Sequence, residues 1–139
     1  MKPKPSHYPQ QLNTLGDHIR SRRLDLDLFQ TDVAEQIGVD TTTICNWESN
    51  ASAPAIRYIP AVLHFLGYNP LHPGQTLIER LVAARKVLGM SQRELALAHG
   101  VDEATWRGWE AREHQPIGRN VELIERFLKT CESPSTPEM

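Results

Sequence analysis

The sequence predicts an all-α protein made of two similar units, each of about four helices. Three observations carry this prediction. The chain matches itself without a gap when it is shifted by 62 residues, so that Leu15 meets Leu77 and Trp47 meets Trp109. Apolar residues recur at helical spacing in each copy. No segment shows the alternation of apolar and polar residues that is typical of a strand.

The repeat extends over residues 15–66 and 77–128, and chance would give roughly three identities over such a span. The residues of the first copy that recur are Leu15, Arg23, Leu26, Gln30, Ala34, Gly38, Val39, Asp40, Thr43, Trp47, Glu48, Pro54, Arg57, Phe65 and Leu66. A Pro- and Gly-rich stretch follows the first copy and reads as a connection. We therefore expect a flexible tail over 1–11, a domain over 12–68, a linker over 69–75, a second domain over 76–130 and a flexible tail over 131–139.

The helices of the first copy are expected in order from the spacing of its apolar residues. A first helix begins near Leu12 and includes Leu15 and Ile19. Residues 30–37 and 41–49 form two short helices, and residues 56–66 form a fourth. The fourth helix contains Pro60, which is compatible with a helix only in its first turn.

The start signals of the helices are clearest in the second copy. Thr76 with Glu79 and Ser91 with Glu94 each form a capping box, in which the two side chains bind free backbone N–H groups. Asp40 and the equivalent Asp102 are good N-caps for the third helix of each copy. Phe29 stands where a polar cap would precede the second helix of the first copy.

The junction of the second and third helices has the pattern of a helix-turn-helix. Ala34 and Ala96 allow the two helices to approach closely, and Gly38 and Gly100 supply the residue of positive φ that commonly follows a helix. A short helix, a Gly-containing turn and another helix make this motif. Its second helix projects its early exposed side chains into the major groove of DNA.

The segments Gln30–Glu48 and Ser91–Glu110 closely resemble the phage-repressor/Cro-type (xenobiotic-response-element-type) helix-turn-helix family. Pro54 and the following residues to Tyr68 resemble the fourth helix of that family. The resemblance covers about residues 12–68 and 74–130. It implies two tandem repressor-like domains in a sequence-specific, DNA-binding transcriptional regulator. A homodimer is one arrangement in which they would act.

The resemblance implies roles for the matching positions. Gln30 and Gln92 correspond to a glutamine that braces the recognition helix or touches the DNA backbone. Asn46 is suited to bidentate pairing with adenine, whereas Gly108, its equivalent, offers no side chain. Structural ion pairs are implied for Arg23 with Glu48 and for Arg85 with Glu110. The full expected DNA-binding set is Gln30, Thr41, Thr42, Thr43, Asn46, Arg57, Gln92, Arg93, Glu103, Ala104, Arg107, Arg112 and Arg119.

The distribution of charge leaves a second interpretation open. The net charge of the chain is −2, and the first half is the more acidic. After the third helix, residues 49–53 carry no charge, whereas the second copy has Arg112, His114 and Arg119 there. Strongly basic surfaces are the usual mark of DNA binding. A protein-interaction or antitoxin-like module, in which one or both motifs no longer bind DNA, is therefore the alternative.

Other classes of function lack a signal. The six histidines and two cysteines have no metal-ligand spacing, and neither a Gly-rich phosphate loop nor a nucleophile elbow occurs. We therefore expect no enzyme activity, metal, cofactor or small-molecule ligand. Because no apolar run approaches the roughly 18 residues of a membrane span, we expect a cytoplasmic protein with free thiols. Trp47, Trp109, Ile44, Val33 and Leu95 are expected in the core.

Overall fold

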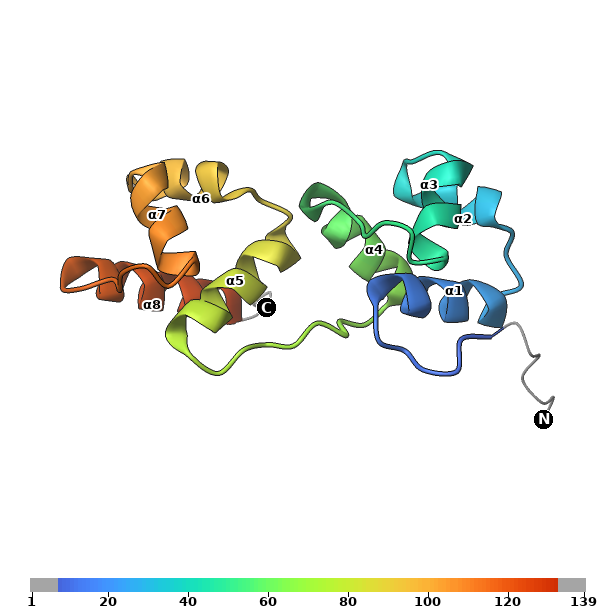
Figure 1. Ribbon diagram of the computed structural model, residues 1–139, viewed down its shortest axis with the longest axis horizontal. Coiled ribbons are helices and arrows are strands. Elements are labelled where there is room, and N and C mark those ends of the chain that lie inside the picture. The colour runs from blue at the N-terminus through green and yellow to red at the C-terminus, as the bar shows by residue number, and fades with distance from the viewer. Residues whose placement is uncertain (1–7, 133–139) are drawn as a thin grey trace, which may run out of the picture. The chain divides into compact units, whose positions relative to one another are not determined.

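The computed structural model describes residues 8–132, which divide into two compact units that meet between Pro70 and Leu71 (Figure 1). Most of the two expected tails, including residues 1–7 and 133–139, lies outside the described residues. Each unit has its own hydrophobic core. The two units are therefore described one at a time.

The described residues are helical and contain no strand, so the all-α prediction is confirmed. The first unit contains α1 (Leu15–Asp25), α2 (Gln30–Ile37), α3 (Thr41–Glu48), a 3₁₀ turn (Ile56–Tyr58) and α4 (Ile59–Leu66). The second contains α5 (Leu77–Leu88), α6 (Gln92–Ala98), α7 (Glu103–Glu110) and α8 (Arg119–Glu132).

Three helix ends differ from expectation. Leu12 lies outside α1 and is exposed, because Thr14 caps the helix and accepts a hydrogen bond from the Asp17 N–H. Ile56 belongs to a 3₁₀ turn, and α4 begins at Ile59, so Pro60 lies in the first turn, where its missing N–H costs nothing. The last helix, α8, continues to Glu132, past the expected domain end at residue 130.

The predicted caps are present. The Thr76 and Ser91 hydroxyls accept from the backbone N–H groups of Glu79 (3.1 Å) and Glu94 (3.0 Å). Helix α2 begins without a side-chain cap from Phe29. Instead, the Phe29 N–H donates to the Asp32 carboxylate at 2.8 Å, which satisfies one donor at the start of the helix.

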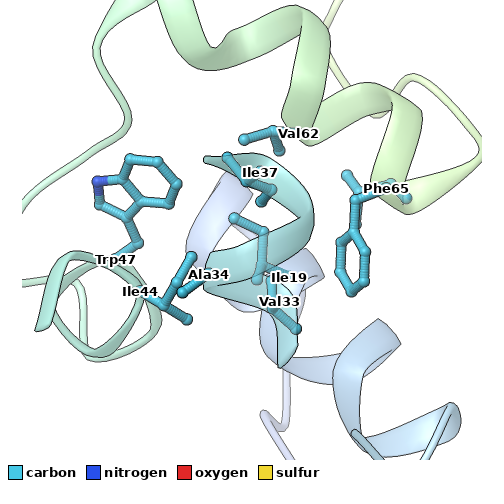
Figure 2. Packing of buried hydrophobic residues seen from close by; sticks show 9 residues of the cluster. Ile19, Val33, Ala34, Ile37, Ile44, Trp47, Val62 and Phe65 are labelled. Carbon is cyan, nitrogen blue, oxygen red and sulfur yellow. The ribbon is translucent and has the colours of Figure 1, made fainter. Parts of the chain in front are cut away.

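The core of the first unit joins all four of its helices (Figure 2). Ile19 comes from α1, Ala34 from α2, Trp47 from α3 and Val62 from α4, and each is buried. The predicted burial of Trp47, Ile44 and Val33 is confirmed. Burying large apolar side chains of this kind stabilises a domain by about 1.5–3 kcal/mol each.

The core of the second unit is similar but more aromatic. Trp109 and Leu95 are buried, as predicted, and Trp106 replaces the Ile44 of the first unit. The rings of Trp106 and Trp109 lie 5.5 Å apart. At the position of the buried Ile37, the second unit has His99, which is only half-buried.

Candidate nucleic-acid interface

The turn between α2 and α3 fixes how the two helices meet. Gly38 ends α2 with a φ of 92°, and the N–H groups of Gly38 and Val39 both donate to the Ala34 carbonyl, at 2.8 and 3.0 Å. In the second unit, the Val101 N–H donates to the Ala96 carbonyl at 2.9 Å and Gly100 has a φ of 68°. Both motifs therefore close with the same bond and the same kind of glycine.

A buried ion pair holds the end of α3 against α1. Arg23 binds Glu48 with two guanidinium nitrogens, at 2.7 and 2.9 Å. Its third guanidinium nitrogen donates to the Leu28 carbonyl at 3.0 Å. The Gln30 amide also donates to Glu48, at 3.1 Å. Only 14% of the Arg23 side chain and 4% of the Glu48 side chain are exposed. The cluster ties α1, α2 and α3 together.

The same ion pair recurs 62 residues later. Arg85 binds Glu110 at 2.8 Å through each of two nitrogens and donates to the Met90 carbonyl at 3.0 Å. Gln92 donates to Glu110 at 2.9 Å, and Trp106 adds a bond at 2.9 Å that the first unit lacks. Burial alone would raise the pKa of Glu110, but hydrogen bonds from Arg85, Gln92 and Trp106, with the Arg85 charge, lower it below its ordinary value.

Both glutamines of the expected DNA-binding set thus have a partner inside the protein. The resemblance implied either a bracing role or a contact to the DNA backbone. The side-chain amides of Gln30 and Gln92 donate to the carboxylates at the ends of α3 and α7, which is the bracing arrangement.

The exposed face of α3 carries the strongest candidate contacts. Thr42 and Asn46 are exposed and Thr41 is half-buried, and none of these side chains forms a hydrogen bond within residues 8–132. Thr43 is different, because its hydroxyl donates to Asp40 at 2.7 Å. That bond and the one from the Thr43 N–H lower the pKa of Asp40. Thr43 therefore has a partner within the unit, because its hydroxyl and its N–H both bind Asp40, the N-cap of α3.

The matching face of α7 is built differently. Ala104 and Arg107 are exposed, and Arg107 pairs with Glu103 at 3.3 Å along the helix. Gly108 is buried, because the ring of His114 covers it: a Cβ atom added at Gly108 would collide with the His114 Nε2. The carboxylate of Glu103, a member of the expected DNA-binding set, is thus paired with Arg107 within the unit.

Five arginines were expected as contacts, and they have different surroundings. Arg93 and Arg119 are exposed and form no ion pair among the described residues. Arg57 is exposed and lies over the Tyr58 ring, 4.7 Å from its centroid. Arg112 pairs with Glu79 at 3.1 Å, so its charge is partly compensated within the unit, which weakens its assignment as a phosphate contact.

The ion pair between Arg112 and Glu79 was not predicted from the sequence. Asn50 occupies the same place in the first unit, where its amide donates to Asp17 at 3.0 Å and its oxygen accepts from the Thr14 hydroxyl at 2.7 Å. Both Asn50 and Arg112 have positive φ, 65° and 62°. The repeat pairs these two residues, and so it contained the signal that they share a structural task.

The described residues contain no group of three His, Cys, Asp or Glu side chains that could hold a metal ion. No helix among them is both long enough and apolar enough to cross a membrane. Cys45 and Cys131 are both exposed, and neither forms a disulfide.

Comparison with known proteins agrees with the geometry of the first unit. Residues 19–72 match a family model described as helix-turn-helix. The match begins within α1, contains α2, α3 and α4, and ends at residue 72, before the first helix of the second unit. The first unit is therefore similar to helix-turn-helix domains, and such domains are typical of DNA-binding regulators of transcription. No curated protein and no solved structure matches the chain.

Proposed function

We propose that the chain is a sequence-specific regulator of transcription that binds double-stranded DNA with two tandem helix-turn-helix domains. Helix α3 would be the recognition helix of the first domain and α7 that of the second. The proposal also assigns the protein to the cytoplasm and gives it no catalytic role. The family match of residues 19–72 supports the first domain.

The single observation that carries the proposal is the free polar face of α3. The other face of this helix is anchored in the core by Ile44 and Trp47, which are buried. Thr42 and Asn46 point outward one helical turn apart and have no partner within the described residues. In this motif such side chains read base edges in the major groove.

Equivalent contacts inside the two units support the second domain. The ion pair, the glutamine brace, the bond that closes the turn and the asparagine or arginine link all recur at a shift of 62 residues. Contacts between residues far apart in sequence recur only if the helices pack in the same way. The second unit thus has the frame to present α7 as the first presents α3.

Binding to DNA is tested first by a salt titration. A protein that binds through phosphates should lose affinity steadily as salt rises, and a sequence-specific one should enrich a defined site from a random pool of duplexes. Absence of binding at low salt would favour the alternative, a protein-interaction or antitoxin-like module.

The role of α3 is tested with Asn46→Ala. The variant should lose about 1–3 kcal/mol of discrimination at one base pair and keep its affinity for random DNA. His64→Ala, an exposed polar residue of α4, is the matched control. Equal discrimination by wild type and Asn46→Ala would contradict the proposed role of this helix.

The two cysteines provide an independent test in the wild-type chain. Cys45 is exposed on α3 next to Asn46, and Cys131 is exposed on α8. Bound DNA should slow the reaction of Cys45 with a maleimide, whereas Cys131 should react at the same rate with or without DNA. If Cys45 reacts equally fast in the complex, α3 does not lie in the groove.

A further inference from the structure

We propose that His114, which lies in the turn after α7, replaces the missing side chain of Gly108 as the residue of the second unit that contacts a base. This inference rests on the proposed function and names one contact within it. The contacted group would be the major-groove edge of a purine, and guanine in particular.

The ring of His114 shapes the surface at Gly108. A Cβ atom added there would collide with Nε2 of His114 and lie 2.8 Å from the ring carbons Cδ2 and Cε1. The imidazole thus occupies the space into which a side chain at position 108 would project. Gly108 is buried by this contact, whereas the equivalent Asn46 of α3 is exposed.

The turn after the recognition helix shares one backbone bond in the two units: the Ala51 N–H donates to the Asn46 carbonyl at 2.8 Å, and the Glu113 N–H donates to the Gly108 carbonyl at 2.9 Å. The first unit adds a bond from the Ser52 N–H to the Asn46 carbonyl at 3.2 Å. In this shared turn Ser52 is the equivalent of His114. The first unit therefore has a large polar residue on the helix and a small one on the turn, and the second unit has the reverse.

Gly108 lies within α7, where a glycine lowers the stability of the helix by about 0.5–1 kcal/mol relative to alanine. An alanine would relieve this cost but would push the imidazole away. A glycine at position 108 is therefore consistent with a function of the His114 imidazole at this place.

His114 is exposed, and neither ring nitrogen is hydrogen-bonded within the described residues. Its ring covers Gly108, which lies one helical turn after the exposed Ala104 on the same face of α7. A ring N–H is a donor. Guanine presents two adjacent acceptors in the major groove, N7 and O6, whereas adenine presents one acceptor beside a donor.

The test selects binding sites from random duplexes with wild type, His114→Ala and Gly108→Ala. Both variants should lose about tenfold in preference for guanine at the same single position, because one removes the ring and the other displaces it. Their affinity for random duplexes should not change. The double variant Gly108→Asn/His114→Ser, which copies the first unit, should exchange that preference for adenine.

The outcomes separate this inference from the proposed function. Wild type that binds no duplex at low salt overturns both. Wild type that selects a site which His114→Ala selects equally well overturns only the role of His114. A uniform loss of affinity for all duplexes in His114→Ala assigns the ring to a phosphate, and this also overturns it. Because His114 is exposed, its variant should fold, which circular dichroism checks.

Discussion

Gly16 lies where the first turn of α1 meets the backbone at the end of α3. A Cβ atom there would collide with the Trp47 carbonyl oxygen and lie 2.8 Å from the carbonyl carbon. Backbone cannot move aside as a flexible side chain can, so the position requires glycine. The equivalent residue of the second unit is Ile78, which shows that α5 and α7 leave more room at this place.

Gly16→Ala should therefore destabilise the protein by about 1–3 kcal/mol, the usual cost of an overpacked contact. Denaturant unfolding followed by circular dichroism would measure the loss. His64→Ala, at an exposed position of α4, is the control. An unchanged unfolding midpoint for Gly16→Ala would show that α1 can move away from α3.

His99 is a second residue whose environment the fold determines. Its ring stacks on Trp106, with centroids 6.0 Å apart, and meets the edge of Phe127 at 5.0 Å. Burial lowers the pKa of His99 below its ordinary value of 6.5. The unfolded chain therefore takes up this proton at higher pH than the folded chain does.

Because the pKa of His99 is lower in the folded state, its contribution to stability is present above about pH 6.5 and falls as the pH drops towards the folded pKa. His99→Ile, which copies Ile37 of the first unit, should remove that part of the pH dependence. The measurement is the free energy of unfolding between pH 5 and 8, with His64→Ala as an exposed control. A slope retained in His99→Ile would assign the effect to another group.

At the scale of elements, α7 offers two ion pairs that differ in burial. The Arg85–Glu110 pair has side-chain exposures of 12% and 7%, whereas the Arg107–Glu103 pair has 58% and 43%. Removing one partner of a buried pair leaves an uncompensated charge in the core, but an exposed pair contributes little. The first pair should hold α5, α6 and α7 together, and the second should not.

Glu110→Ala should cost about 3–5 kcal/mol of stability, and Glu103→Ala should cost at most about 1 kcal/mol. Because the pKa of Glu110 is lowered, its contribution should be present above the ordinary value of 4.5 and be lost as the pH falls through the folded pKa. Equilibrium unfolding of both variants at pH 7 and below pH 4 tests this. Equal losses at pH 7 would contradict the difference in burial.

At the scale of the whole molecule, the units differ in what they offer DNA. The first has unbound polar side chains on α3, and the second has two exposed arginines without an ion pair in the described region, Arg93 and Arg119. Base contacts specify a sequence, while phosphate contacts position the protein. We expect the first unit to supply most of the specificity and the second most of the affinity that is independent of sequence.

Arg93→Ala or Arg119→Ala should weaken binding to every duplex and lower the salt slope by about one each. Arg112→Asn is the matched control, because Arg112 already pairs with Glu79 and Asn is the residue of the first unit at this left-handed position. The comparison uses a selected and a random duplex at two salt concentrations. If Asn46→Ala weakens binding to both duplexes equally while these arginine variants alter sequence preference, the roles are reversed.

Much of the fold followed from local sequence. Capping boxes at Thr76 and Ser91, the glycines that end the turns and the helical spacing of the core residues act between neighbours, and therefore they can be found in one dimension. The repeat also indicated contacts between residues far apart in sequence, because the Arg23–Glu48 pair recurs as Arg85–Glu110.

The sequence by itself determined the all-helical fold, the repeated unit and the side chains that anchor it. Only the tertiary structure decided which polar residues remain free for a partner. The Thr43 hydroxyl binds Asp40, Arg112 pairs with Glu79, and His114 covers Gly108. The physical reason is that periodicity assigns a residue to a face of its helix, whereas its hydrogen bonds depend on which other segment packs beside it.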